Sequence, residues 1–405
     1  MIKTNHRLGI LLFATLLGLQ GPGRAQEAGP PPAGLPRLRE LDFSPLPQAP
    51  TQPGVERTAK IASLVKEATV LEVQAALQAG EVTSEELTRY FLNRIQRYDG
   101  WLRSYTELNP RCLEEARAAD RLRAEGKVLG PLHGIPLNLK DNIGTVAPLH
   151  TTAGAEILLN HSPARDAAVV TQLRGAGAVI LGKASLSELA GALTTQPPGY
   201  NAVSGIGINP HGKDLPVSGS SSGSGISVSA CLTMGSVGSE TSGSLISPAS
   251  MTGVVAMKPS LGRVSGEGIV PLIRYQDSAG PVARSVTDAA VLLAAIDLGE
   301  EDYAAGLDPK ALEGVPAGIL RKAIAGPEDR VRNADWLTLI DHGLRKAKAV
   351  SRDVELQGKI ELLPVLFLGL SQDTIGYLAN AGAPVKTLAD LQAYNAAKPT
   401  PARRQ

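Results

Sequence analysis

Serine and glycine are concentrated in the centre of this sequence, where residues 218–250 contain 13 Ser and 6 Gly in 33 positions. Apolar residues such as Ile226, Val228 and Leu232 recur through the segment, which indicates that it packs and does not act as a flexible linker. The glycine patterns of a phosphate-binding loop or a dinucleotide site do not occur in it. Small residues that bring hydroxyl and backbone N–H groups close to a ligand favour acyl transfer, with a serine nucleophile and an oxyanion hole.

A serine nucleophile needs a base, and histidine is the first kind to consider. Residues 219–223 match the Gly-x-Ser-x-Gly elbow of α/β-hydrolases, with Ser221 as the nucleophile and His342 as the one histidine after it. The elbow requires a buried strand directly before the serine, and residues 213–218 make a poor strand. His342 lies among charged residues, as a surface histidine would. An elbow-type Ser-His-Asp esterase is therefore the alternative interpretation.

Lysine is the second kind of base. Lys140 ends the short apolar stretch 135–140 and is followed by Asp141, Asn142 and Ile143. Burial in such a place lowers the pKa of a lysine toward the neutral amine, which can take a proton from a serine directly or through a second hydroxyl. A structural ion pair with Asp141 is the non-catalytic explanation of the same lysine.

The elements that would hold these residues follow a β-α-β rhythm. Thr69 and Thr83 each stand three residues before a glutamate, which is the capping-box pattern that begins a helix. Short apolar stretches separated by helical segments predict an α/β fold with a largely parallel sheet. After the first two helices, the predicted elements are a helix over 110–124, a strand over 135–140, a helix over 166–174, a strand over 179–181, a helix from Ser185 and a helix over 285–297.

Composition excludes several classes of protein. The 405 residues carry 40 Lys+Arg and 39 Asp+Glu, a net charge of +1, so the chain has no basic surplus for binding nucleic acid. Six His and two Cys are too few for a multi-ligand zinc site or a disulfide framework. We expect Cys112 and Cys231 to be buried free thiols and not a disulfide.

The first 58 residues have the pattern of export and leader sequence. A basic start, the apolar run Leu8–Leu19 and a small-x-small site at Gly23–Ala25 predict a cleavable signal peptide over 1–25. The apolar run has twelve residues, which is too short to cross a bilayer as a helix. A Pro-rich leader follows over 26–58, and residues 59–405 form the main domain. We therefore expect an exported protein, periplasmic or extracellular, without stable membrane insertion.

Several ordered motifs between about residues 70 and 300 resemble the amidase signature family. Together, at compatible spacings, they are far more specific than any one of them alone. The motifs are Gly130–Ile143, Thr151–Gly154, Asp166–Val170, Gly175–Lys183, Ser218–Ser224, Gly238–Ser244, Met257–Ser260 and Gln276–Ser285. The resemblance implies a single large α/β domain with a twisted mixed β-sheet flanked by helices.

By motif position, the resemblance also implies amide hydrolysis by a Ser–Ser–Lys triad. Lys140 corresponds to the base, Ser244 to the nucleophile, and Ser220 to the bridging serine that the family holds across a cis peptide bond. The implied chemistry requires no metal and no cofactor, and the substrate is a small-molecule carboxamide or a short peptide-like amide. The oxyanion hole corresponds to the backbone N–H groups of Thr241, Ser242, Gly243 and Ser244.

Departures from the family pattern narrow the expectation. Ser242 stands where Gly is usual, Ile246 where Arg is common and Glu240 where Asp is frequent. These changes indicate the peptide-amidase-like branch, and a signal peptide argues against the tRNA-dependent amidotransferases because charged tRNA is cytoplasmic. Members usually continue well beyond the stretch resembling 382–395, so we expect the domain to be C-terminally shortened. The alternative from another functional class is an inactive truncated paralogue or a binding protein.

Overall fold

The computed structural model describes residues 38–44, 55–191, 196–299, 301–321, 330–355 and 362–397. They form two compact units, a larger one from the described parts of 27–306 and 361–405 and a smaller one from those of 307–360. The predicted signal peptide 1–25 lies outside the described residues, as does most of the predicted leader 26–58. Helix α1 (Val55–Glu67) begins within the range predicted as the leader.

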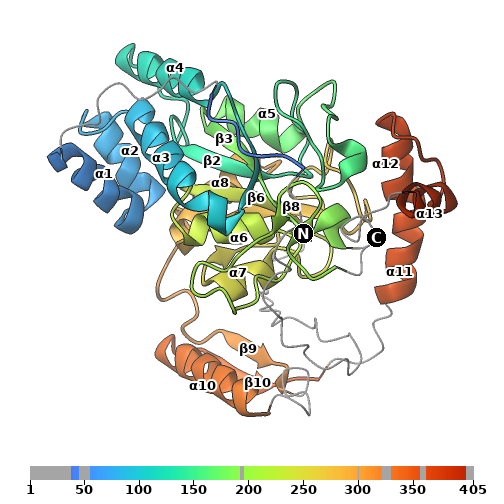
Figure 1. The fold of residues 1–405 in the computed structure, drawn as a ribbon. Coiled ribbons are helices and arrows are strands. Elements are labelled where there is room, and N and C mark those ends of the chain that lie inside the picture. Colours follow the sequence, from blue (N-terminus) through green and yellow to red (C-terminus); the bar gives the residue numbers. More distant parts are fainter. Residues whose placement is uncertain are drawn as a thin grey trace, which may run out of the picture. The chain divides into compact units, whose positions relative to one another are not determined.

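A six-stranded mixed sheet forms the centre of the larger unit (Figure 1). Its strand order is β1-β3-β2-β6-β8-β7, with β2 parallel to β3 and β6 and the other pairs antiparallel. The α/β fold with a mixed sheet and flanking helices is thereby confirmed, although the β-α-β rhythm overestimated the parallel part. The strands are β1 (Tyr105–Leu108), β2 (Pro136–Lys140), β3 (Val179–Ala184), β6 (Gly235–Glu240), β7 (Val255–Ala256) and β8 (Ser278–Ala283).

The helices of the first third begin where the capping boxes predict. The side chains of Thr69 and Thr83 accept hydrogen bonds from the backbone N–H groups of Glu72 and Glu86, and each glutamate accepts one from its threonine N–H. These boxes satisfy donors that a helix start leaves without intrahelical partners. The helices are α2 (Val70–Gln78), α3 (Ser84–Leu102) and α4 (Cys112–Ala124).

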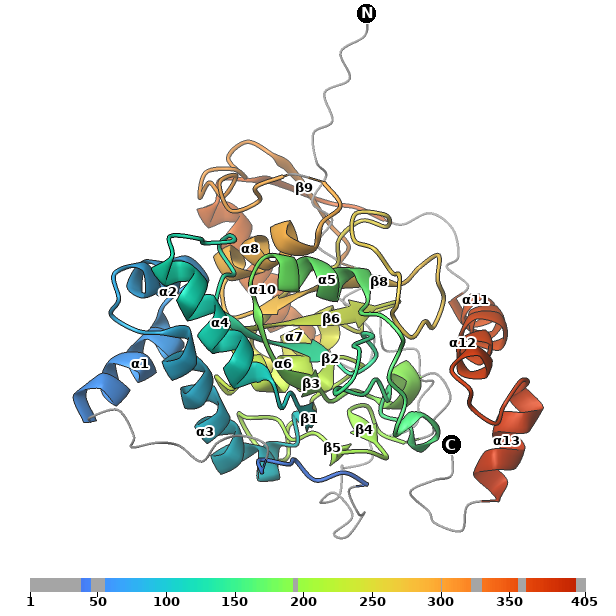
Figure 2. The same cartoon turned by 90° about the horizontal axis from the view of Figure 1, so that it is seen from above.

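Different helices cover the two faces of the sheet, because successive residues of a strand face opposite sides. A Cβ on Gly235 of β6 would meet Leu292 of α8. A Cβ on Gly238, on the other face, would meet Ser221 and Leu245, the residues directly before α6 and α7. Helix α5 packs beside α8 (Figure 2). These helices are α5 (Ala168–Gly175), α6 (Ser222–Ser229), α7 (Ile246–Thr252) and α8 (Val286–Ile296).

Strand β2 turns alternate side chains toward α6. Asn138 Nδ2 donates to Ser227 Oγ of α6 at 2.9 Å, and Lys140, two residues further on, faces the same side. Leu139 pairs with Val237 of the parallel strand β6. The residues of β6 after Val237 therefore run beside the end of β2, where Lys140 stands.

The prediction of a helix that begins at Ser185 is wrong, because residues 185–187 are not helical and the described residues continue with a short 3₁₀ segment, η2 (Glu188–Gly191). The backbone donors in this stretch bond to distant parts of the chain. Ser185 N donates to Ser104 O, and Ser187 N donates to Ser220 O at 3.0 Å. Tertiary contacts thus override the local helical pattern.

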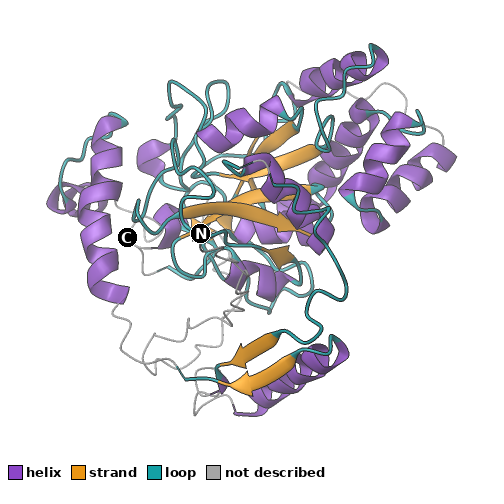
Figure 3. Ribbon diagram, turned by 180° about the vertical axis from the view of Figure 1, so that it is seen from behind, coloured by secondary structure: helices purple, strands orange, loops and turns teal. Residues whose placement is uncertain are grey.

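Residues after 361 add a run of helices to the larger unit (Figure 3). Ile375, Leu378 and Leu391 from these helices form a second apolar cluster with Ala153 and Leu158, at the 3₁₀ segment η1 (Glu156–Leu158). The elements are α11 (Leu362–Gly369), a π-helical turn η3 (Leu370–Thr374), α12 (Ile375–Asn380) and α13 (Leu388–Ala396).

The described residues of the smaller unit include two parallel strands and the helix α10. Strand β9 (Pro316–Ile319) pairs with β10 (Val350–Asp353), and α10 (Arg330–Lys346) lies between them in sequence. Arg321 forms ion pairs with Asp341 of α10 and Asp353 of β10, both at 2.7 Å.

The described N-terminal segment 38–44 lies against a loop of the larger unit. Leu38 N donates to Ala202 O and Arg39 N to Val203 O, next to the hairpin of β4 (Tyr200–Asn201) and β5 (Gly205–Ile206). Both cysteines are free thiols, as predicted, but only Cys112 is buried as expected, and Cys231 is partly exposed. In the described part of the chain no helix is long and apolar enough to span a bilayer.

Candidate active site

Lys140 stands at the end of β2 with its side chain fully buried. Its Nζ lies 2.8 Å from Ser220 Oγ, 3.0 Å from Ser239 Oγ and 3.0 Å from the Ser239 carbonyl oxygen. The fold thus brings two predicted site residues, Lys140 and Ser220, into direct contact.

The environment of Lys140 favours the neutral amine. Burial lowers the pKa of Lys140 from 10.5 to about 7, while the carboxylates of Asp277 and Glu240 act in the opposite direction. The alternative of an ion pair with Asp141 is not formed: the carboxylate of Asp141 lies 3.9 Å from Nζ of another buried lysine, Lys183. Lys140 is therefore held as a group that can change protonation state near neutral pH.

The donors and acceptors around Lys140 are compatible with a proton path from Ser220 to a neutral amine. A neutral amine has two N–H donors and one lone pair. The carbonyl oxygen of Ser239 can only accept, and Ser239 Oγ already accepts from Asn142 Nδ2 at 2.9 Å. Ser239 Oγ has a second lone pair, so it can accept from Lys140 as well. Both N–H groups of a neutral Lys140 can then point at Ser239, and this arrangement makes the lone pair available to the hydroxyl of Ser220.

Ser220 is fixed by its backbone on both sides. The Gly219–Ser220 peptide bond is cis, as the resemblance implied. The carbonyl of Ser220 accepts from Ser187 N at 3.0 Å, and the next residue, Ser221, donates its N–H to the carbonyl of Ser244 at 3.0 Å. This last bond brings the loop that carries Ser244 to the side of Ser220.

Ser244 lies between β6 and α7 and is half-buried. No residue in the described part of the chain forms a hydrogen bond with its Oγ. The third predicted site residue is thus adjacent to the Lys140–Ser220 pair, and its hydroxyl is free to engage a ligand.

The loop from Thr241 to Ser244 offers a run of backbone donors. Among the described residues, none accepts a hydrogen bond from the N–H groups of these four positions. The next two donors are used: Leu245 N and Ile246 N donate to the Glu240 carboxylate at 2.7 and 3.1 Å. Gly243 has a φ of +85°, which glycine adopts without strain. The predicted oxyanion-hole residues are therefore brought together with their N–H groups unpaired.

Sequence reasoning missed Ser239 and Asn142, which surround the amine of Lys140. Asn142 Nδ2 contacts both Ser239 Oγ and the carbonyl of Val270 at 3.3 Å. Asn142 follows Lys140 by two residues, so its place in the same motif was the available signal. Ser239 lies in the motif Gly238–Ser244, but it is one serine among 13 in the central segment, and its spacing did not indicate a contact with Lys140.

Similarity to known proteins agrees with this geometry. The family model described as Amidase matches residues 86–332, which is more than half of the chain. The chain belongs to the amidase family. Membership supports a hydrolase that acts on amide bonds, as the sequence predicted.

Amidases from several organisms are similar to this chain. A probable amidase from Arabidopsis thaliana is 38% identical over 82% of the chain and 68% of the relative. A glutamyl-tRNA(Gln) amidotransferase protein from Moorella thermoacetica is 38% identical over 65% of the chain and 55% of the relative. The crystal structure of the peptide amidase from Stenotrophomonas maltophilia superposes with a TM-score of 0.76 at 39% identity, covering 82% of this chain and 72% of that one.

These similarities leave the branch of the family open. The peptide amidase and the amidotransferase protein have nearly the same identity to the chain, at 39% and 38%. The chain spans 39% to 68% of the length of the first curated relatives. The substrate of this amidase is therefore treated as a proposal below.

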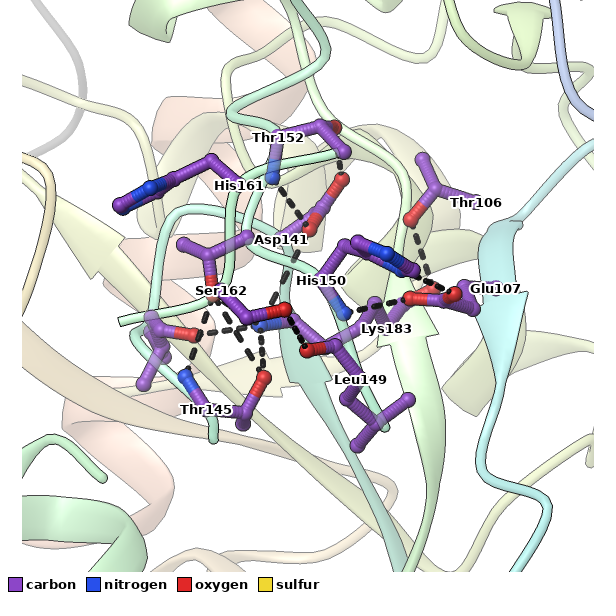
Figure 4. A network of polar contacts seen from close by, with 12 residues as sticks. Thr106, Glu107, Asp141, Thr145, Leu149, His150, Thr152, His161, Ser162 and Lys183 are labelled. Atoms are coloured by element: carbon purple, nitrogen blue, oxygen red, sulfur yellow. Dashed lines mark hydrogen bonds and ion pairs between the residues drawn. The ribbon is translucent and has the colours of Figure 1, made fainter. Parts of the chain in front are cut away.

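A second buried network adjoins the amidase site (Figure 4). Lys183 Nζ donates to the carbonyl of Ile143 at 2.5 Å and to Thr145 Oγ1 and Thr151 Oγ1 at 3.1 and 3.2 Å. Burial lowers the pKa of Lys183 to about 8, and Asp141 opposes this shift. The network ties the segment after β2 to the end of β3, so it holds the strand end that carries Lys140.

The elbow-type alternative lacks the structure that it requires. Residues 207–221 contain no strand, and Ser221 Oγ donates to the carbonyl of Ser239 at 3.0 Å. His342 is exposed on α10 in the smaller unit. In the described part of the chain, His, Cys, Asp and Glu also form no group of three that could hold a metal ion.

We expect Gly219→Ala to damage the amidase site. A Cβ at this position would lie 2.1 Å from Ser187 Oγ, so either the side chain of Ser187, which accepts from Gly199 N, or the segment that carries Ser220 must move. A misplacement of this kind lowers kcat/KM by about 100-fold, and overpacking costs about 1–3 kcal/mol in the free energy of unfolding. Both are measured by amide turnover and urea unfolding.

Gly100→Ala is the matched control. Gly100 lies in α3, and a Cβ there would meet nothing within 4 Å. Alanine should stabilise this helical position by about 0.5 kcal/mol and leave turnover unchanged. Wild-type turnover by Gly219→Ala would contradict the close packing inferred between Gly219 and Ser187.

Proposed function

We propose that this chain hydrolyses a small-molecule carboxamide or a short peptide-like amide through an acyl-Ser244 intermediate. The observation that carries the proposal is the 2.8 Å contact between buried Lys140 and Ser220, beside a serine whose hydroxyl has no partner among the described residues. Family membership supplies the reaction class, and the triad supplies the mechanism.

In the proposed first step, Ser244 Oγ attacks the amide carbonyl carbon. Its proton passes to Ser220 Oγ as the proton of Ser220 passes to the lone pair of Lys140. A base with a pKa near the working pH is effective in this role, because it is neutral before the step and charged after it. The pKa of about 7 for Lys140 supports this assignment.

The negative oxygen of the tetrahedral intermediate would then be held by the free N–H groups of Thr241, Ser242, Gly243 and Ser244. Donors that are already oriented toward a developing charge act without reorganisation, and losing one typically lowers kcat by about 100- to 1,000-fold. Return of the proton through Ser220 to the nitrogen of the leaving group releases the amine. A water molecule, deprotonated through the same relay, then cleaves the acyl–Ser244 ester.

The setting of the reaction forms part of the proposal. The signal-like residues 1–25 support export to the periplasm or the medium, and the near-balanced charge supports a small-molecule or short peptide partner over nucleic acid.

Covalent labelling tests the proposed nucleophile. A fluorophosphonate should phosphonylate Ser244 Oγ with loss of fluoride, and peptide mass spectrometry should locate the added mass on the peptide that contains Ser244. Ser221→Ala should be labelled like the wild type. Labelling at Ser221, or a folded protein that takes up no label, would contradict the proposal.

A further inference from the structure

Two of the motifs shared with the family, 257–260 and 276–285, each contribute a side chain that contacts the loop Thr241–Ser244, called the oxyanion loop below. Neither side chain has a role in the proposed mechanism. Lys258, from the motif 257–260, donates from Nζ to the carbonyl oxygen of Thr241 at 2.7 Å. Gln276, from the motif 276–285, donates from Nε2 to the same oxygen at 3.1 Å. Two donors, one of them a cation when protonated, thus converge on one backbone carbonyl.

This carbonyl shares its peptide group with the N–H of Ser242. A trans peptide is planar, so its C=O and N–H bonds point in opposite directions. Holding the oxygen of Thr241 therefore fixes the direction of the Ser242 N–H, one of the four unpaired donors of the loop. A positive charge at the oxygen also draws electron density from the N–H, which makes that N–H a stronger donor toward an anion.

The side chain of Thr241 is held as firmly as its carbonyl. Its Oγ1 donates to Asp277 Oδ1 at 2.5 Å. The other oxygen of Asp277 accepts from Leu272 N and Ile273 N at 2.8 and 3.0 Å, which fixes the carboxylate in turn. Side chain and carbonyl of Thr241 are both anchored, while its own N–H stays free.

The sheet explains how Lys258 reaches a loop on another strand. Strand β8 lies between β6 and β7, and β7 pairs with the same residues of β8 as the start of β6 does. The chain after β7 continues along β8 in the direction of the loop after β6. Met257 N donates to Pro281 O at 3.1 Å, and a Cβ on Gly280 would lie 2.1 Å from Met257 O. Gly280 thus permits the close approach that directs Lys258 toward Thr241.

We propose that Lys258 is a positioning residue of the oxyanion hole, which it orients and polarises through the Thr241–Ser242 peptide together with Gln276. The inference rests on the proposed function, because it assigns a role toward the tetrahedral intermediate. It adds a residue that touches neither the substrate nor the reacting atoms.

The test separates binding of the ground state from binding of the transition state. Lys258→Met removes the donor and the charge, and Lys258→Arg keeps both. For an amide that the wild type hydrolyses, we expect Lys258→Met to lower kcat by about 10- to 100-fold, less than loss of a direct donor. We expect KM to stay within about twofold, because uniform binding is untouched. Lys258→Arg should recover most of kcat.

A trifluoromethyl ketone analogue of that substrate provides the second readout. It forms a tetrahedral adduct that carries a negative oxygen, so its inhibition constant should rise by the same factor as kcat falls. A structural defect elsewhere would not link these two quantities. Unchanged kcat in Lys258→Met, a loss confined to KM, or unchanged inhibition by the ketone would each overturn the inference.

Two further variants keep the result decisive. Gln276→Leu removes the second donor to the same oxygen and should shift kcat in the same direction, which replaces the main test if Lys258→Met does not fold. Arg94→Met is the matched control, because Arg94 also donates to two backbone carbonyls, those of Ala230 and Cys231 at 2.8 Å, away from the site. It should leave kcat and inhibition by the ketone unchanged.

Failure of the proposed function and failure of this inference give different results. If Ser244→Ala retains full turnover, the proposed function fails. If Ser244→Ala is inactive and Lys258→Met has wild-type kcat, this inference alone fails.

Discussion

Ser244→Ala is expected to lower kcat for amide hydrolysis by about a million-fold, because removal of the nucleophile in serine hydrolases costs this much. The side chain is half-buried and its Oγ bonds to no described residue, so alanine leaves no buried partner unsatisfied. The variant should therefore fold like the wild type. The measurement is turnover of aryl and peptide amides, with circular dichroism and urea unfolding on the same samples.

Ser250→Ala is the matched control for this substitution. Ser250 is an exposed serine of α7, six residues after Ser244, and it has no part in the proposed mechanism. It should keep wild-type kcat, KM and fluorophosphonate labelling. Equal turnover by the wild type and Ser244→Ala would contradict the assignment of Ser244 as the nucleophile and therefore the proposed acyl-Ser244 intermediate.

The parts of the fold that the sequence predicted are those with local causes. Both capping boxes begin helices because the threonine and the glutamate three residues later satisfy each other's backbone donors. Strand β2 occupies most of the predicted range 135–140, a stretch that is short and alternating as a strand requires. The assignment of Lys140, Ser220 and Ser244 as site residues came from the family resemblance and not from any local pattern.

The parts that the sequence did not predict depend on contacts between distant residues. The stretch after Ala184 has a helical pattern, yet the N–H of Ser187 bonds to the carbonyl of Ser220 and the helix does not form. Lys258 and Thr241 are 17 residues apart on different elements, and only the order of β6, β8 and β7 brings them together. The order of strands in the sheet depends on contacts throughout the chain, so local sequence patterns do not predict it.

A buried lysine without an ion-pair partner is costly for the fold, and the site shows why the cost is tolerated. The hydrogen bonds of Lys140 go to neutral oxygens of Ser220 and Ser239 and not to a carboxylate. A carboxylate in contact would hold the ammonium form and remove the base. Asp141, directly beside Lys140, is instead directed toward Lys183 and Thr152. The sheet thus gives two buried lysines different partners, neutral oxygens for Lys140 and the carboxylate of Asp141 for Lys183.

The pH dependence of the reaction should reveal Lys140 as the base. The neutral amine is required, and its pKa is about 7, so kcat/KM should rise with pH through about 7 and then level off. Lys140→Met should lower kcat by about 1,000- to 10,000-fold and abolish the rise of kcat/KM with pH. Lys183→Met is the comparison for the shape of the pH profile and not for kcat, because its loss leaves Asp141 without its ion-pair partner. Lys183 is equally buried, has a pKa of about 8 and contacts neither Ser220 nor Ser244. If the rise of kcat/KM with pH disappears in Lys183→Met and persists in Lys140→Met, the titrating group is Lys183 and the prediction is contradicted.

Stability provides an independent measurement of the same protonation. The unfolded chain binds a proton at Lys140 up to a pKa near 10.5, whereas the folded protein releases it above about 7. Between these values the unfolded state binds more protons, so this group makes the free energy of unfolding rise with pH, and below about 7 its contribution is constant and unfavourable. Lys140→Met lacks this component, so urea unfolding at pH 7 and pH 9.5 should show a smaller rise for the variant than for the wild type. The same rise in both proteins would mean that Lys140 stays charged in the fold, and a charged lysine could not act as the base.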